Sequence, residues 1–203
     1  MKKVYIETLG CQMNKSDAER MYGMLEYLDY YQTDNPKNAD LLIINTCSIR
    51  QLSEDKAYSA IGVWGKWKKD KPDLKIVFAG CVAQQDGKRF EKFFHRAPYV
   101  DLILGTQRLY ELPNLVKRME YGETHIVSID EKPYEESDIK INRVKGINAW
   151  VPIMEGCNNF CTYCIVPYTR GRERSRKSEL IISSSLPFSI ILPLSIIIIL
   201  SQS

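Results

Sequence analysis

The feature that most constrains the fold is a short apolar run that recurs three times in the first 81 residues and is followed each time by a cysteine. The runs occupy residues 4–10, 39–46 and 74–80, and each is followed by a longer stretch of mixed charge and helical length. Short apolar runs bounded by turn residues are typical of buried strands. We therefore predict an α/β fold whose three parallel strands share one sheet, with helices packed on its faces.

The three cysteines behind these runs are Cys11, Cys47 and Cys81, at spacings of 36 and 34 residues. Because the carboxyl ends of parallel strands lie at one edge of a sheet, we expect the three side chains to meet there. A single cysteine after a strand is most often a small buried hydrophobe. The same placement at three successive strand ends favours a shared metal site with three thiolate ligands.

A second group of cysteines, Cys157, Cys161 and Cys164, has the spacing C-x3-C-x2-C. Three thiolates on a 4Fe-4S cluster leave one iron open, and an open position on a metal is a place for substrate or cofactor. A zinc site needs a fourth ligand, and neither His95 nor His125 falls within thirty residues of the group. A disulfide or redox pair is the remaining alternative, and the chain lacks the secretory start typical of disulfide-stabilised proteins.

Four segments around the cysteines carry a resemblance to a known family: TLGCQMN at 8–14, NTCSIR at 45–50, GCVAQ at 80–84 and GCNNFCTYCIVPYTRGR at 156–172. Over about residues 1–177 they resemble the radical S-adenosylmethionine (radical SAM) methylthiotransferases, specifically the MiaB type that modifies tRNA. Sister branches of that family act on a ribosomal protein or on a different modified adenosine. The segments at 11–14 and 167–172 favour the MiaB type.

The resemblance implies two 4Fe-4S clusters and S-adenosyl-L-methionine as cofactors. Cys11, Cys47 and Cys81 would hold an auxiliary cluster, where a sulfur atom is methylated. The cluster of Cys157, Cys161 and Cys164 would bind a second S-adenosylmethionine and cleave it to a 5'-deoxyadenosyl radical. The methylthio group would replace the hydrogen on C2 of N6-isopentenyladenosine beside the tRNA anticodon. The resemblance assigns no catalytic residue beyond these cluster ligands.

The predicted domain organisation follows from composition and from the resemblance. We expect an N-terminal methylthiotransferase domain over 1–128, with a fourth strand at 100–104 and a helix that Pro113 opens. A polar stretch with Pro133 and five acidic residues predicts a linker over 129–145. A strand at 147–154 then delivers the cysteine loop, and by resemblance residues 146–178 begin a radical SAM partial βα barrel.

The last part of the chain, residues 179–203, is an anomalous apolar tail, because residues 180–203 carry no charge in 24 positions. An apolar stretch of roughly 20 residues is long enough to span a bilayer, so a tail anchor is one interpretation. Pro187, Pro193 and several serines predict a poor helix, which favours a truncated or frame-shifted end and no membrane association. A truncated chain makes a catalytically incomplete iron-sulfur-binding fragment the alternative to an active enzyme.

The formal net charge of +3 is only weak evidence on nucleic-acid binding, so local clusters of charge are more informative. Five basic residues crowd 170–177, and two tryptophans stand among four lysines at 64–71. Either run is a candidate for phosphate contact or a solvated surface. Phe160 and Tyr163 are expected to pack on the cofactor or to shield the cluster from water. The expected partners are tRNA and an electron donor such as a flavodoxin or ferredoxin. We expect the protein to be a monomer in the cytoplasm.

Overall fold

The largest element of the fold is a six-stranded, fully parallel sheet of order β2-β1-β3-β4-β5-β6. The computed structural model describes residues 1–49, 51–130, 141–142, 149–189 and 197–199, with 185–189 and 197–199 described by their backbone alone. The strands are β1 (Lys2–Thr8), β2 (Tyr30–Gln32), β3 (Leu41–Thr46), β4 (Lys75–Gly80), β5 (Leu102–Leu104) and β6 (Ile126–Ser128).

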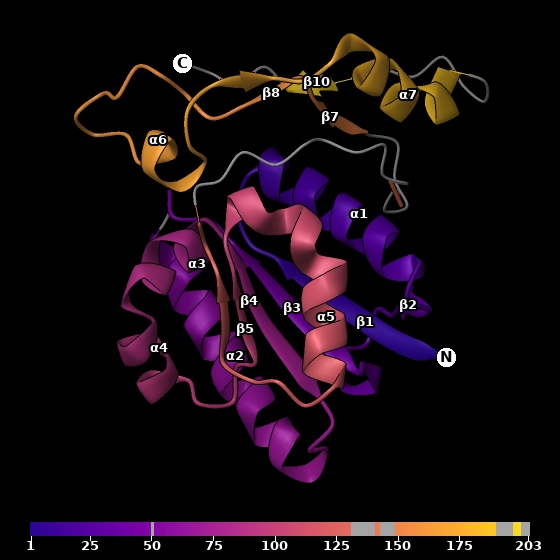
Figure 1. Cartoon of the computed structure of the whole chain (residues 1–203), viewed down its shortest axis with the longest axis vertical. Coiled ribbons are helices and arrows are strands. Elements are labelled where there is room, and N and C mark those ends of the chain that lie inside the picture. Colours follow the sequence, from indigo (N-terminus) through magenta and orange to yellow (C-terminus); the bar gives the residue numbers. More distant parts are fainter. Residues whose placement is uncertain (50, 131–140, 143–148, 190–196, 200–203) are drawn as a thin grey trace.

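The strand order reverses between β1 and β3, since β2 lies on one side of β1 and all later strands lie on the other (Figure 1). This order of the first five strands is one of the two common orders of doubly wound α/β folds. In such sheets ligands bind outside the carboxyl ends of the strands at the point of reversal. A ligand site is therefore expected at the residues that follow β1 and β3.

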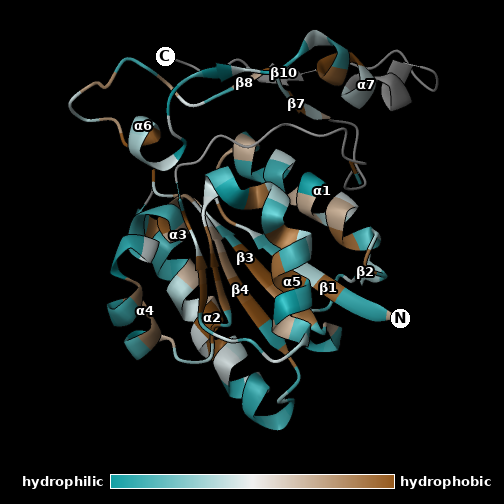
Figure 2. Cartoon of the chain, viewed as in Figure 1, coloured by the Kyte–Doolittle hydropathy of each residue, from teal (hydrophilic) through white to brown (hydrophobic). Residues whose placement is uncertain are grey.

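Helices cover both faces of the sheet. On one face lie α1 (Gln12–Glu26) and α5 (Leu112–Glu120), and on the other lie α2 (Gln51–Asp70) and α4 (Phe90–Arg96). Alternate residues of β3 serve the two cores, with Leu41 and Ile43 on the α1 side and Leu42 and Ile44 on the α2 side. Because both faces are buried, the central strands β3, β4 and β5 are apolar along most of their length (Figure 2). The predicted α/β fold with a parallel sheet is confirmed.

Shorter elements complete this body: η1 (Pro36–Asn38), α3 (Cys81–Asp86), η2 (Gly87–Arg89) and η3 (Thr106–Glu111). The strand expected at 100–104 is present as β5, and Pro113 is the second residue of α5 rather than its first. The sequence did not predict β2 and β6, because their residues, YYQ and IVS, do not form an apolar run like the one at 100–104. The helix expected after Cys81 is divided into α3 and α4.

A second layer lies across one end of the sheet in Figure 1. It contains β7 (Trp150–Pro152), β8 (Met154–Glu155), α6 (Val166–Thr169), β9 (Arg174–Ser175), α7 (Ser178–Ser189) and β10 (Ile197–Ile199). Strand β8 pairs with β9 in antiparallel fashion, and β7 pairs with β10 in parallel. The expected strand at 147–154 is present where the structure describes it, as β7 and the start of β8.

Two predictions about the later chain have different outcomes. The expectation of a poor helix in the tail is wrong for Ser178–Ser189, which forms α7. Only the last three residues of α7 lie at or beyond Pro187, so the proline affects only the end of the helix. No helix in the described part of the chain is long and apolar enough to cross a membrane. The linker over 129–145 falls mostly outside the described residues, and the domain boundaries stay predictions.

Candidate metal centres

The first cysteine group, here called the auxiliary cysteines, comprises Cys11, Cys47 and Cys81. Cys11 is the N-cap of α1, Cys47 directly follows β3, and Cys81 is the first residue of α3. Cys47 and Cys81 are buried, and Cys11 is half-buried. The three residues follow three adjacent strands, two of which flank the point where the strand order reverses. The sheet thus gathers three thiol-bearing residues at the edge where doubly wound folds bind ligands.

Two glycines allow the strand ends to approach one another closely. A Cβ atom at Gly10 would lie 2.2 Å from the Cβ atom of Cys47, and a Cβ atom at Gly80 would lie 2.4 Å from the carbonyl oxygen of Thr46. Both glycines also have positive φ, of 133° and 94°. Residues with a side chain would push Cys11 and Cys81 away from the end of β3.

A buried polar network holds the same three strand ends together. The amide Nδ2 of Asn14 donates to Asn45 Oδ1 at 3.0 Å and to the Thr46 carbonyl at 2.9 Å, and Asn45 Nδ2 donates back to the Asn14 carbonyl at 2.8 Å. The Thr46 hydroxyl donates to the Ala79 carbonyl at 2.6 Å and accepts from the Val82 N–H at 3.2 Å. Asn14, Asn45 and Thr46 therefore position the auxiliary cysteines.

The thiols of Cys11 and Cys47 affect each other's pKa. The Cys11 thiol donates to Asn14 Oδ1 at 3.2 Å, and its interaction with Cys47 lowers the pKa of Cys11 and raises the pKa of Cys47. Burial opposes the lowering at Cys11, while the N–H groups of Asn14 and Met13 at the start of α1 and the Arg170 guanidinium support it. Cys11 is thus the thiol of the pair that loses its proton first, as a metal ligand must.

The second group, here called the loop cysteines, comprises Cys157, Cys161 and Cys164 in the loop between β8 and β9. The backbone N–H of Cys157 donates to the Gly171 carbonyl at 3.1 Å, and that of Cys164 donates to the Cys161 carbonyl at 3.0 Å. Gly156 has a φ of 78°, and a Cβ atom there would lie 2.1 Å from the Arg172 carbonyl oxygen. The two ends of the loop are therefore fastened to each other directly beside Cys157.

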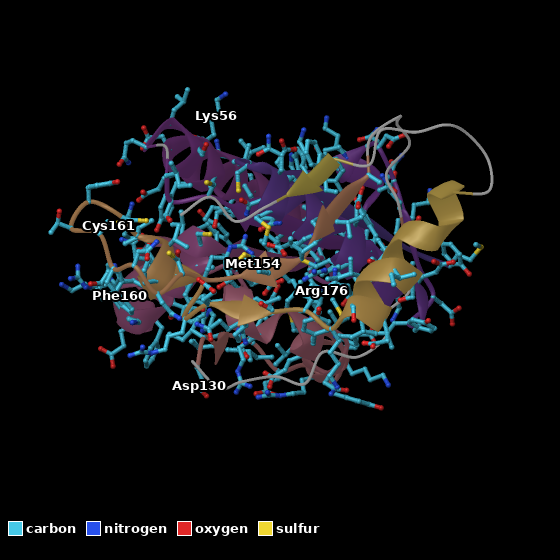
Figure 3. All side chains as sticks on the ribbon, turned by 90° about the horizontal axis from the view of Figure 1, so that it is seen from above. Lys56, Asp130, Met154, Phe160, Cys161 and Arg176 are labelled. Atoms are coloured by element: carbon cyan, nitrogen blue, oxygen red, sulfur yellow. The ribbon has the colours of Figure 1, made fainter. Side chains whose placement is uncertain are left out.

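The loop cysteines differ in exposure: Cys157 is buried, Cys164 is half-buried and Cys161 is exposed. Cys161 and Phe160 lie together at one end of the molecule in the view from above (Figure 3). The Phe160 ring packs edge-on against Tyr168 with a centroid distance of 5.9 Å, whereas the Tyr163 side chain is 90% exposed. The roles predicted for Phe160 and Tyr163 at a cofactor stay predictions.

Two buried ion pairs join the cysteine loop to α1. Arg20 Nη1 lies 2.7 Å from Glu155 Oε1, and Arg170 Nη2 lies 2.7 Å from Asp17 Oδ2. All four side chains are at most 9% exposed. No local pattern in the sequence marks these residues as partners, because they come from segments far apart in the chain. The pairs place the loop cysteines and the auxiliary cysteines in one connected structure.

Several side chains of the two basic runs are buried or ion-paired, so the runs are not simply solvated surface. In the run at 170–177, Arg170 is buried against Asp17, and Arg176 Nη1 donates to the Pro152 carbonyl at 2.7 Å. In the run at 64–71, Trp64 belongs to the core, and two lysines form ion pairs with Asp101 and Asp40. The exposed basic residues left in these runs are Lys66, Lys69, Arg172 and Lys177.

The donor chemistry of both groups suits an iron-sulfur cluster, since soft thiolates are the usual ligands of such clusters. The glycines at positions 10 and 80 provide the close approach that a shared centre at the auxiliary cysteines requires. Within the described residues, no three Cys, His, Asp or Glu side chains already stand together as a ligand set for a metal ion. The assignment of all six cysteines as ligands therefore stays a prediction.

Comparisons with known proteins agree with the resemblance noted above. A tRNA-2-methylthio-N(6)-dimethylallyladenosine synthase of Actinobacillus pleuropneumoniae serotype 5b is 45% identical over 178 residues, covering 87% of this chain and 37% of that protein. Synthases of the same name from Carboxydothermus hydrogenoformans and Thermodesulfovibrio yellowstonii are 45% and 44% identical and cover 88% and 89% of this chain.

The chain spans about two fifths of the length of these relatives, at 37%, 40% and 41%. Residues 3–105 match the family described as Uncharacterized protein family UPF0004. That match covers β1 to β5 and all three auxiliary cysteines. The chain therefore belongs to the UPF0004 family.

Proposed function

We propose that this chain is a radical SAM methylthiotransferase that acts on tRNA and methylthiolates C2 of N6-isopentenyladenosine next to the anticodon. The observation that carries the proposal is the placement of two cysteine triplets on the two sides of one interface. The names of relatives at 44–45% identity support the same activity. An aromatic C–H bond offers little to acid-base catalysis, so the reaction needs the radical that a loop cluster with bound S-adenosylmethionine supplies.

The residues of this chain have distinct parts in the proposal. The loop cysteines hold the cluster that binds S-adenosylmethionine, and the exposure of Cys161 leaves that cluster reachable from outside the fold. The auxiliary cysteines hold the second cluster in a buried place, with Asn14, Asn45 and Thr46 fixing the strand ends. The substrate tRNA implies a cytoplasmic protein, and we propose a monomer reduced by a flavodoxin or ferredoxin.

Iron binding tests the ligand assignment directly. After anaerobic reconstitution with iron and sulfide, we expect about eight irons per chain, because each triplet carries one 4Fe-4S cluster. Replacing Cys11, Cys47 and Cys81 together with Ala should leave about four irons, and so should replacing the three loop cysteines. A value near four in the unaltered chain would contradict the two-cluster assignment.

Activity requires a separate measurement. The unaltered chain, given S-adenosylmethionine, a reductant and isopentenylated tRNA, should yield the methylthiolated nucleoside, measured by mass spectrometry of the digested tRNA. The variant Cys157→Ala should lose the product because it loses a ligand of the radical-forming cluster. A chain that binds about eight irons but forms no product would instead favour the iron-sulfur-binding fragment without catalysis.

A further inference from the structure

The buried ion pair between Asp17 and Arg170 links the two cysteine groups. Arg170 directly follows α6 in the loop of the loop cysteines, and Asp17 lies on α1, which begins directly after Cys11. Both side chains are 7% exposed, and Arg170 Nη2 lies 2.7 Å from Asp17 Oδ2. A guanidinium stays charged in proteins, and burying a charge is costly unless other charges offset it.

The backbone around Arg170 is fixed against the sheet on several sides. The Thr106 hydroxyl donates to the carbonyl of Thr169, and a Cβ atom at Gly171 would lie 2.7 Å from Gln107 Nε2. The short helix α6 packs against α3, whose first residue is Cys81. The Gly171 carbonyl accepts the N–H of Cys157 at 3.1 Å. Residues 169–171 thus lie between η3 and a loop cysteine, next to the helix that Cys81 begins.

The Arg170 guanidinium is buried and its charge is paired with Asp17, whose Oδ2 lies 2.7 Å from Nη2. The Arg170 charge also acts on Cys81, the first residue of α3, against which α6 packs. Deprotonated cysteines that carry a cluster would add negative charge beside this cation.

We propose that Arg170 is a positioning residue for the auxiliary cluster: its buried cation holds the Cys157 loop against the auxiliary cysteines and offsets the negative charge of their cluster. The inference rests on the proposed iron-sulfur function. It gives Arg170 two separable effects, one on the docking of the loop and one on the charge beside the cluster. An arginine that is merely structural would have only the first.

The reduction potential of the auxiliary cluster tests the charge effect. The measurement uses the full chain with all three loop cysteines replaced by Ala, so that only the auxiliary cluster contributes. In this background Arg170→Gln should shift the potential to a lower value, because the reduced, more negative cluster loses a nearby cation. The variant Arg170→Lys keeps the charge and should restore most of the shift.

Arg20→Gln is the matched control, because Arg20 is the other buried arginine that pairs across the same interface. Its largest charge interactions are with Glu155, Tyr110 and Asp17. Hydrogen exchange of the Cys157 amide in the metal-free chain should become faster in both arginine variants. Only the Arg170 variant should shift the potential.

Removing Arg170 alone leaves Asp17 buried without its cation and can prevent folding. Comparing the single variant Asp17→Asn with the double variant Asp17→Asn/Arg170→Gln avoids this problem. The auxiliary cluster should have the lower reduction potential in the double variant. Equal potentials, or unchanged exchange of the Cys157 amide in Arg170→Gln, would overturn the inference. A parent chain that binds no iron would instead count against the proposed function.

Discussion

At the scale of single residues, the candidate centres depend on glycines that directly precede cysteines. Gly10, Gly80 and Gly156 stand before Cys11, Cys81 and Cys157, and all three have positive φ. A Cβ atom at any of them would overlap a neighbouring atom at 2.1–2.4 Å. Each position thus requires glycine for two reasons, its backbone conformation and a close contact. The site therefore depends on these glycines as well as on the cysteine side chains.

Gly80→Ala should destabilise the chain more than Gly122→Ala, a control that shares the φ of 94°. A Cβ atom at Gly122 has no other atom within 4 Å, whereas one at Gly80 meets the Thr46 backbone at 2.4 Å. We expect Gly122→Ala to cost about 1 kcal/mol from strain alone and Gly80→Ala about 2 kcal/mol more from the clash. Urea unfolding of the two variants measures the difference, and equal losses would contradict the close-approach argument.

At the scale of elements, two aspartates at the starts of strands bind lysines in the last turn of α2 or directly after it. Asp101 precedes β5, forms an ion pair with Lys68 at 2.5 Å and accepts the Ile76 N–H at 2.8 Å. Asp40 precedes β3, forms an ion pair with Lys71 at 2.5 Å and accepts the Lys3 N–H at 2.8 Å. The two arrangements differ mainly in burial, because the Asp101 side chain is 2% exposed and that of Asp40 is 36% exposed.

Asp101→Ala should therefore cost more stability than Asp40→Ala. Loss of Asp101 leaves a buried N–H and a largely buried ammonium without their partner, for which we expect about 3 kcal/mol. Loss of the half-exposed Asp40 should cost about 1 kcal/mol or less, because water replaces its contacts. Denaturant unfolding of the two variants in parallel decides the matter, and a larger loss for Asp40→Ala would show that burial is not the controlling factor.

At the scale of the whole molecule, the second layer is held to the sheet by charges as well as by packing. The Arg20–Glu155 and Asp17–Arg170 pairs both cross this interface, and α1 supplies one acid and one base. Additional contacts include the hydrogen bond from Thr106 to the Thr169 carbonyl. The interface places the loop cysteines near the carboxyl edge of the sheet, where the auxiliary cysteines lie.

Arg20→Gln should loosen this interface. Breaking a pair whose side chains are 3% and 9% exposed leaves Glu155 buried without its main cation, and we expect a cost of about 3 kcal/mol. Trypsin should then cleave faster after Arg170, Arg172 and Arg174. Lys2→Gln breaks an exposed pair with Glu120 and should cost at most about 1 kcal/mol, without faster cleavage there. Equal protease resistance in both variants would argue against a docking role for Arg20.

The sequence predicted the elements whose evidence is local. Residues 39–46 and 74–80 are continuous apolar runs, and a strand buried on both faces needs that composition wherever it stands. The position of Cys11, Cys47 and Cys81 after three such strands was enough to place them at one edge, because parallel strands share their direction. The spacing of Cys157, Cys161 and Cys164 likewise needs no tertiary information to suggest a cluster loop.

The tertiary structure alone decided what depends on distant contacts. Strand β2 exists because it pairs with β1, and its three residues carry no pattern of their own. Arg170 looked like part of a basic surface, yet it is buried because Asp17 on a distant helix offsets its charge. Arg20 and Glu155 are 135 positions apart, so only folding makes them partners. Local composition determines strands and ligand types, whereas burial and charge pairing depend on which segments the fold brings together.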